Sequence, residues 1–240
     1  NEPGAKDAIH NWNAWIGTDE AGKGDYFGPL VAAAVYVDAE CRETFSDLGV
    51  TDGKRLSNRR IQNLAESMRC RYAQHIVVVE KMPAEYNSLY ATLRRRGQNL
   101  NHLLASLHAE AIRTLANSVG AKYALVDQFS KEDLITRQLS LRANNAPPLQ
   151  RGAASTPCEI KIKQVTKAER DIAVAAASII ARDAFLTGMD TLSEKYEMRL
   201  PRGAYQVVEA GREFVKLHGS DALQNVAKLH FNLTDAVRAL

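Results

Sequence analysis

Short apolar runs and longer segments with helical spacing alternate along the chain, and polar turns separate them. The short runs are rich in Val, Ile and Ala, which is typical of β-strands. They cover residues 12–16, 30–38, 73–80, 121–126 and 159–165, and the first continues to two adjacent acids, Asp19 and Glu20. Short connections predict an antiparallel arrangement for the first three strands. The fourth follows a long helix and should therefore pair in parallel with an earlier strand.

The longer segments predict helices. The clearest covers residues 100–119, where leucine and alanine side chains recur three and four positions apart. Gly120 is placed to end this helix, and Ser57 is placed as the N-cap of a helix over 58–71. The other helices are expected at residues 39–48, from 82 onward, and at 131–141, 172–186, 206–217 and 221–231.

Alternating strands and helices predict an α/β fold, and 240 residues suit one large domain with a full core. The chain is 45% apolar and 25% charged with a net charge of +3, which allows a nucleic-acid partner without requiring one. No apolar run approaches the ~20 residues that span a bilayer, so we expect no membrane partner. Three scattered cysteines without CxxC spacing indicate reduced thiols and a cytoplasmic location.

Candidate chemistry begins in the stretch after the first apolar run. Asp19 and Glu20 precede the turn Gly22-Lys23-Gly24. Carboxylates can hold a divalent cation there, while Lys23 and the glycine amides bind an anion. Neighbouring strand residues point to opposite faces, so the two acids share a site only where the strand ends. A hairpin with surface charges is the alternative, and these residues alone do not decide between the two.

Two further carboxylates stand at the ends of predicted elements. Asp127 ends the fourth strand, and Glu169 precedes the helix over 172–186. If the first and fourth strands are neighbours, Asp19 and Asp127 lie side by side, because paired strands are about 4.8 Å apart. Oxygen ligands favour Mg²⁺ or Mn²⁺ over zinc, and a pair of such ions hydrolyses phosphodiesters. Capping is the alternative role for Asp127 and Glu169, and it is the preferred interpretation of Asp171.

Several other polar residues have a structural and a functional interpretation. His102 and His108 are six positions apart and do not share a helical face, so both are interpreted as surface or core histidines. Ser178 lies in an apolar helix and is interpreted as a packing residue. Tyr26 can stack on a sugar or base or pack in the core, and Asn101 can cap a helix or contact a nucleic-acid strand.

Together these segments resemble type 2 ribonucleases H, in the form typical of ribonuclease HIII. The opening motif Gly17–Pro29 carries most of the resemblance. The other matching segments follow in order: 82–87, 99–105, 126–129, 166–169, 175–182, 200–204 and 228–231. A set of motifs spread from about Trp15 to the end of the chain is far more specific than any single one.

The resemblance implies a ribonuclease H-like fold, with a mixed five-stranded sheet flanked by helices and a C-terminal helical extension. It implies a cytoplasmic endonuclease that cuts the RNA strand of RNA/DNA hybrids with Mg²⁺ or Mn²⁺. We expect a monomer that leaves 5′-phosphate and 3′-hydroxyl ends. The implied catalytic and metal-binding residues are Asp19, Glu20, Asp127 and Glu169. The expected substrate-binding residues are Gly22, Lys23, Gly24, Tyr26, Lys54 and Asn101.

The chain departs from the family pattern at two places. Gly53 stands where the family loop carries a hydroxyl side chain. Ribonuclease HIII proteins also carry an N-terminal substrate-binding domain, whereas here we expect a leader over 1–12 and a catalytic domain over 13–240 without it. Two other functions stay open at this point: a ribonuclease HII-like activity that also nicks at single ribonucleotides, and a hybrid-binding module without catalysis.

Overall fold

The computed structural model describes residues 9–51, 53, 56–130, 132–144 and 160–239. Its centre is a five-stranded sheet with the order β3-β2-β1-β4-β5. The strands are β1 (Trp15–Ala21), β2 (Leu30–Val37), β3 (Ile76–Lys81), β4 (Tyr123–Asp127) and β5 (Lys161–Val165). β2 is antiparallel to β1 and β3, whereas β4 is parallel to β1 and β5. The predicted mixed sheet is therefore confirmed.

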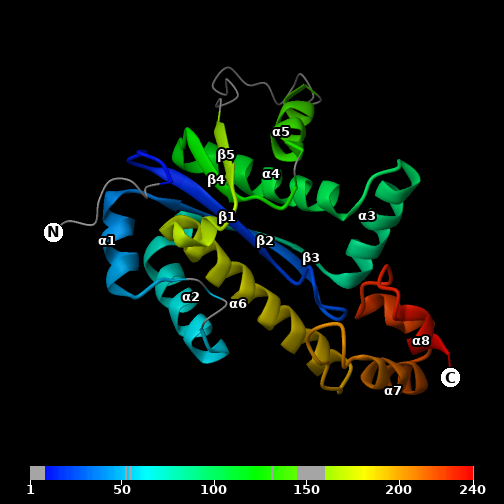
Figure 1. The fold of residues 1–240 in the computed structure, drawn as a ribbon. Helices are drawn as coiled ribbons and strands as arrows, with labels where there is room; N and C mark the ends of the chain where they lie inside the picture. The colour runs from blue at the N-terminus through cyan, green and yellow to red at the C-terminus, as the bar shows by residue number, and fades with distance from the viewer. Residues whose placement is uncertain (1–8, 52, 54–55, 131, 145–159, 240) are drawn as a thin grey trace.

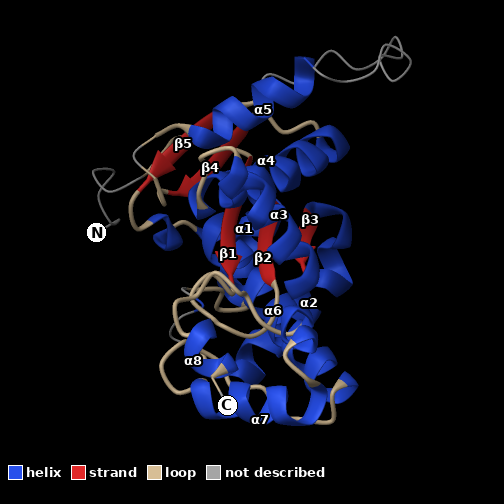
Figure 2. Cartoon of the chain, turned by 90° about the vertical axis from the view of Figure 1, so that its right-hand side faces the viewer, coloured by secondary structure: helices blue, strands red, loops and turns tan. Residues whose placement is uncertain are grey.

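Helices cover both faces of the sheet (Figure 1). They are α1 (Ala39–Asp47), α2 (Asn58–Tyr72), α3 (Pro83–Arg95), α4 (Leu100–Val119), α5 (Leu134–Asn144), α6 (Ile172–Lys195), α7 (Val208–His218) and α8 (Thr234–Arg238). One buried cluster lies between the sheet and α4, and the other lies between the sheet and α6, α1 and α2. The turned view places α7 and α8 together at one end of the molecule (Figure 2).

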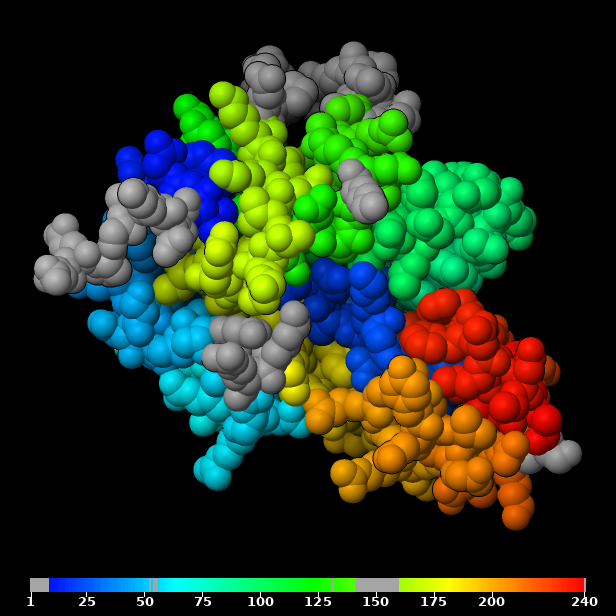
Figure 3. Space-filling model, viewed as in Figure 1, coloured from blue at the N-terminus to red at the C-terminus, as the bar shows by residue number. Residues whose placement is uncertain are grey.

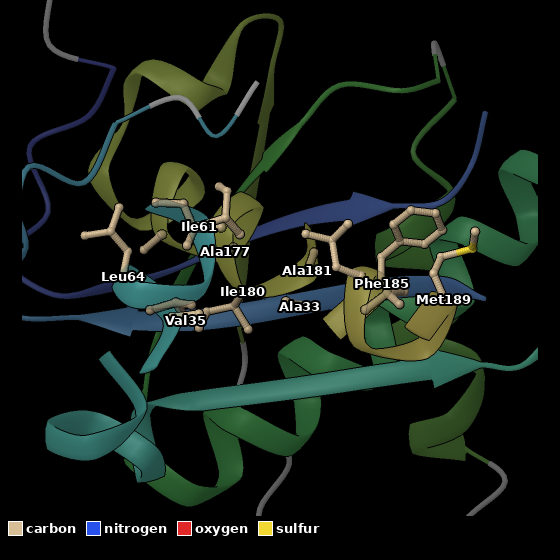
Figure 4. Packing of buried hydrophobic residues seen from close by; sticks show 14 of the residues in the cluster. Ala33, Val35, Ile61, Leu64, Ala177, Ile180, Ala181, Phe185 and Met189 are labelled. Atoms are coloured by element: carbon tan, nitrogen blue, oxygen red, sulfur yellow. The ribbon is translucent and has the colours of Figure 1, made fainter. Parts of the chain in front are cut away.

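Helix α6 packs unusually close to the sheet because its buried side chains are small. A Cβ atom on Gly17 of β1 would stand 2.2 Å from the carbonyl carbon of Ala173, so only glycine fits there. Farther along, Ile180 of α6 packs among Val35 of β2 and Ile61 of α2 (Figure 4). This close contact sets how the carboxyl end of β1 faces α6.

Helix α6 is also the one described helix that is long and apolar enough to cross a membrane. In this fold, 78% of its most apolar 18-residue window is buried, as expected of a core helix.

Several element boundaries differ from those predicted. β1 begins at Trp15 and runs through both acids to Ala21. β3 begins at Ile76, because residues 73–75 form a short 3₁₀ turn. Helix α6 continues to Lys195 instead of ending near residue 186, since Met189 and Leu192 still face the core.

The predicted final helix over 221–231 is wrong. The chain forms a short 3₁₀ turn at Asp221–Asn225, makes an isolated β-bridge at Ala227 with the loop after β1, continues in turns, and becomes helical again only at Thr234. The backbone N–H of Lys228 donates to the carbonyl of Tyr26 at 2.8 Å, and Phe27 forms an antiparallel β-bridge with Ala227. This pairing with a segment about two hundred residues away uses the backbone groups that a helix would need.

Candidate active site

The carboxyl ends of β1 and β4 bring two aspartates together. Thr18 of β1 is in register with Val126 of β4, so the next residues along the two parallel strands are Asp19 and Asp127. Side chains along a strand alternate between the two faces of the sheet. Asp127 is two positions after Leu125, which belongs to the cluster under α6, so Asp127 and its neighbour Asp19 face α6. The condition under which Asp19 and Asp127 were expected side by side, that the first and fourth strands are neighbours, is met.

Asp19 lies in a crowded, partly buried environment. Its Oδ1 atom accepts a hydrogen bond from the backbone N–H of Glu20 at 2.9 Å, and the Ser178 hydroxyl of α6 also bonds to it. Burial, followed by the nearby charge of Glu20, raises the pKa of Asp19 from 3.8 to about 6. The protein therefore holds this carboxylate in its charged form at a free-energy cost that a bound cation would remove.

Glu20 points to the opposite face, toward α4. Its Oε2 atom lies 3.2 Å from Nε2 of His108, and its Oε1 atom lies 3.7 Å from Nζ of Lys23. The other imidazole nitrogen of His108 lies 2.9 Å from the Thr18 hydroxyl. The His108 side chain is fully buried, so these contacts hold the Glu20 carboxylate at the strand end.

Asp127 and Glu169 meet where the chain turns into α6. The Oδ1 atom of Asp127 accepts a hydrogen bond from the backbone N–H of Ala168 at 3.0 Å. This contact holds the 3₁₀ turn Ala168–Arg170, which carries Glu169, against the end of β4. Within the described residues, the buried Oε2 atom of Glu169 has no hydrogen-bond partner. A buried carboxylate oxygen without a donor is a position where a cation fits.

Asp171 has a different role. Its Oδ1 atom accepts hydrogen bonds from the backbone N–H groups of Ala173 and Val174, which makes it the N-cap of α6. The carboxylate also contacts Nε1 of Trp15 at 3.0 Å and Nε2 of His10 at 3.2 Å. With its oxygens engaged this way, Asp171 caps a helix, as its sequence position indicated.

The loop after β1 places a basic turn that contains two glycines next to Glu20. Gly22 has a positive φ of 84°, and a Cβ atom there would stand 2.1 Å from the carbonyl oxygen of Pro29, so this position requires glycine. Gly24 is exposed, and a Cβ atom there would meet nothing within 4 Å. Lys23 between them has a side chain that is 41% exposed. The turn is therefore open to a large anionic ligand.

Taken as a donor set, the site offers carboxylate oxygens and no thiolate among the residues described around it. Asp19 of β1, Asp127 at the end of β4 and Glu169 in the turn before α6 come from three segments of the chain, and Glu20 follows Asp19 at the end of β1 with its carboxylate on the α4 face of the sheet. Hard oxygen ligands of this kind suit Mg²⁺ or Mn²⁺. The residues present therefore fit a divalent metal.

A family model described as ribonuclease HII matches residues 16–234. The chain belongs to the ribonuclease HII family. Ribonuclease HIII of Protochlamydia amoebophila (strain UWE25) is 37% identical over 223 residues, which are 92% of this chain and 67% of that relative. Ribonuclease HIII of Chlamydia pneumoniae is 37% identical over 225 residues, covering 92% of this chain and 69% of the relative. The chain thus spans about two thirds of the length of these relatives.

Solved structures agree with this family. The crystal structure of Bst-RNase HIII in complex with Mn²⁺ superposes with a TM-score of 0.78 at 31% identity, covering 94% of this chain and 69% of that one. The ribonuclease H2 of Pyrococcus horikoshii OT3 shares the fold, with a TM-score of 0.70 at 22% identity. The chain is a metal-dependent endonuclease of the ribonuclease HIII type, and its substrate is the RNA of RNA/DNA hybrids.

Not every residue expected to bind substrate lies where substrate can reach it. The Tyr26 side chain is fully buried and packs edge-on against Phe27 and Phe231, so its predicted contact with substrate is corrected to a core role. Asn101 is half-buried in the first turn of α4, and its contact with substrate stays a prediction. Lys54 lies outside the described residues.

The sequence interpretation missed three residues that surround the acids. His108 contacts Glu20, Ser178 contacts Asp19, and Phe129 stacks on the His108 ring at 5.3 Å. For His108 and Ser178 a signal was present, since each is a polar residue within the buried stripe of an otherwise apolar helix. A polar group buried in this way needs a partner, and here the partner is a catalytic-site acid or its neighbour.

Proposed function

We propose that Asp19, Glu20, Asp127 and Glu169 hold two divalent ions, Mg²⁺ or Mn²⁺, at the ends of β1 and β4. The observation that carries this proposal is the buried Glu169 oxygen, unpartnered within the described residues, in the turn whose Ala168 N–H bonds to Asp127 at the end of the strand paired with β1. Bound ions of this kind activate a water and stabilise the departing oxygen of a phosphodiester. Cleavage would leave 5′-phosphate and 3′-hydroxyl ends.

The protein's own groups prepare these acids for the reaction. His108 and Lys23 contact different oxygens of Glu20, and Ser178 contacts Asp19, so these two carboxylates are oriented before any cation arrives. Asp19 must be ionised to act as a ligand, and its raised pKa of about 6 means that acid solution competes with the cation. We assign His108 and Ser178 as residues that position the acids.

The turn Gly22-Lys23-Gly24 is the proposed contact with the RNA strand. Gly24 leaves the backbone uncovered, and Lys23 carries an exposed positive charge next to Glu20. Exposed amides and a cation suit a sugar–phosphate backbone, and in a hybrid the RNA strand presents its 2′-hydroxyls in a wide, shallow minor groove. The loop lies at the surface beside the green segment that follows β4 (Figure 3).

A second basic group extends the proposed binding surface along α6. Arg182 lies one helical turn beyond Ser178, and its guanidinium contacts Oδ1 of Asn58 at 3.4 Å. The guanidinium of Arg202 contacts the same oxygen at 3.2 Å. Two guanidinium groups that converge on Asn58, the first residue of α2, support a contact with a phosphate backbone there.

The alternative functions are separated by one assay with two substrates. The purified protein is incubated with Mg²⁺ or Mn²⁺ and either a full RNA/DNA hybrid or a DNA duplex that contains one ribonucleotide. The proposal predicts cleavage of the hybrid alone. Cleavage of both duplexes would indicate ribonuclease HII-like activity, and binding without cleavage of either would contradict catalysis.

The family of the chain and its free thiol support a proposal for the cellular compartment and the oligomeric state. We propose that the protein acts in the cytoplasm as a monomer. Cys41 is buried as a free thiol, which suits a reducing compartment. Sedimentation of the protein with and without hybrid tests the monomer.

A further inference from the structure

Residues 226–228, near the C-terminus, lie along the loop that follows β1. Figure 3 shows this loop in blue directly beside the red C-terminal region. The N–H of Gly28 donates to the carbonyl of Val226 at 2.9 Å, and the N–H of Lys228 donates to the carbonyl of Tyr26 at 2.8 Å. These bonds attach the loop to a part of the chain that lies outside the sheet.

The side chain of Lys228 adds a second set of bonds to the same loop. Its Nζ atom donates to the backbone carbonyls of Asp25 at 2.8 Å, Phe27 at 3.3 Å and Gly28 at 2.7 Å. Together with the backbone bond to Tyr26, one residue thus binds the carbonyls of four consecutive residues. The three N–H groups of the ammonium match the three carbonyls that remain.

The buried position of Lys228 imposes a desolvation free-energy cost on its charged ammonium group. The side chain is fully buried, and the Tyr86 ring is 5.9 Å from Nζ. The Oδ1 atom of the Asp25 carboxylate accepts a hydrogen bond from the N–H of Gly203 at 2.7 Å. Burial lowers the pKa of Lys228 to about 7, opposed by the charge of Asp25. An apolar side chain of similar length would avoid the desolvation but leave three buried carbonyls without donors.

The segment fixed by Lys228 continues directly into the proposed substrate turn. The N–H of Asp25 donates to the carbonyl of Gly22 at 3.3 Å. This bond connects the turn to residues 25–28, which Lys228 holds. On its other side the turn joins β1 immediately after Glu20. Gly22-Lys23-Gly24 is therefore held between the catalytic strand and Lys228, although its own residues are small or exposed.

We propose that Lys228 is a positioning residue for substrate binding: it fixes the backbone of residues 25–28 so that the Gly22-Lys23-Gly24 turn is preorganised for the nucleic-acid backbone. This inference rests on the proposed role of that turn. A preorganised loop lowers the entropy lost on binding, so its loss weakens binding more than it slows chemistry. Lys228 itself touches neither the substrate nor the acids.

The test compares Lys228→Met with Lys216→Met, which removes an exposed lysine from α7 and serves as the matched control. Amide resonances of Gly22 and Gly24 report the loop conformation without requiring activity. We expect them to shift or broaden in K228M and to stay unchanged in K216M, with resonances of Gly120 unchanged in both. Unmoved Gly22 and Gly24 resonances in a folded K228M protein would overturn the inference.

Kinetics with the RNA/DNA hybrid give the second readout. K228M is expected to raise KM by about tenfold while kcat stays within about threefold. A merely structural defect would instead lower the active fraction, and with it kcat, at unchanged KM. If K228M does not fold, Lys228→Gln is the second variant, because its amide retains two N–H donors. K228Q should show a KM between those of the wild type and K228M. A wild-type KM in K228Q together with unmoved Gly22 and Gly24 resonances would overturn the inference.

The two proposals can fail separately. If the wild-type protein does not cleave the hybrid, the proposed function fails whatever the spectra show. If the wild type cleaves the hybrid and K228M matches its KM and its Gly22 and Gly24 resonances, the positioning role of Lys228 fails and the proposed function stands.

Discussion

The Nε2 atom of His108 lies 3.2 Å from the Oε2 atom of Glu20, across the face of the sheet that α4 covers. The Thr18 hydroxyl fixes the other ring nitrogen at 2.9 Å, and Phe129 stacks on the ring. A fully buried imidazole thereby orients an acid that the sheet pleat turns away from Asp19. Glu20 depends on α4 for its orientation, while Asp19 depends on α6.

Replacing His108 should weaken metal use more than it weakens the fold. In His108→Ala we expect the metal concentration for half-maximal cleavage to rise about tenfold or more, because partners that orient metal-binding carboxylates contribute on that scale. His108→Gln, which keeps a donor, should lie between H108A and the wild type. Titration of cleavage rate against Mg²⁺ or Mn²⁺ measures the effect, and equal metal dependence in all three proteins would refute the positioning role.

The raised pKa of Asp19 predicts how stability depends on pH without added metal. Since the folded-state pKa is about 6 and the ordinary value is 3.8, the folded protein binds this proton more tightly than the unfolded chain does. The contribution of Asp19 to the free energy of unfolding therefore falls as pH rises from 3.8 to about 6 and stays low above that.

Asp19→Asn removes this dependence. In the presence of a chelator, we expect D19N to be more stable than the wild type by about 1–3 kcal/mol above the raised pKa. Near and below the ordinary pKa the advantage should disappear. Urea unfolding across this pH range provides the measurement. A D19N protein less stable than the wild type at neutral pH would mean that the charged carboxylate is stabilising in the fold.

The two glycines of the substrate turn should respond differently to the same substitution. Gly24→Ala meets open space, so its free energy of unfolding should stay within about 0.5 kcal/mol of the wild type, while KM for the hybrid rises because a methyl group covers the backbone. Gly22→Ala forces a side chain into a positive φ and against Pro29, and should lower stability as well. Unfolding curves and hybrid kinetics on both variants decide this; unchanged KM in G24A would argue against backbone contact.

Glu169 and Asp171 are two positions apart, and their substitutions should have opposite effects. Glu169→Gln should abolish cleavage at little loss of stability, because the Oε2 atom of Glu169 has no partner within the described residues. Asp171→Ala removes the N-cap of α6 and the bond from Trp15, and should destabilise the fold by about 1–3 kcal/mol while cleavage persists. Loss of cleavage in a folded D171A protein would reverse the assignment.

The sequence predicted the parts of this site that depend on local pattern. Asp19 and Asp127 were each expected at the end of an apolar run, but their contact was expected only if the first and fourth strands are neighbours, because the long helix predicted parallel pairing with an earlier strand without saying which one. The contact of His108 with Glu20 could not be derived this way, because 88 positions separate them and helical spacing shows only which face is buried. It needs the relative rotation of α4 and β1, which tertiary packing sets.

Burial also decided cases that residue type left open. Tyr26 was interpreted as a residue that stacks on substrate or fills the core, the core being the more common place for an aromatic ring, and the C-terminal segment that covers it places it in the core. That same segment explains the failed helix over 221–231, since its backbone bonds go to the loop after β1. Contacts between the two ends of a chain leave little trace in local periodicity.

The central claim is that the four acids form the catalytic metal site of a ribonuclease that cuts RNA in hybrids. Asp127→Asn tests it most directly, because the amide keeps the Oδ1 acceptor for the Ala168 N–H and removes only the charge. Cleavage of a full RNA/DNA hybrid and binding to the same hybrid are measured side by side, with thermal unfolding as the control for folding. The account predicts that D127N folds and binds the hybrid like the wild type but does not cleave it. Wild-type cleavage by D127N would contradict the account.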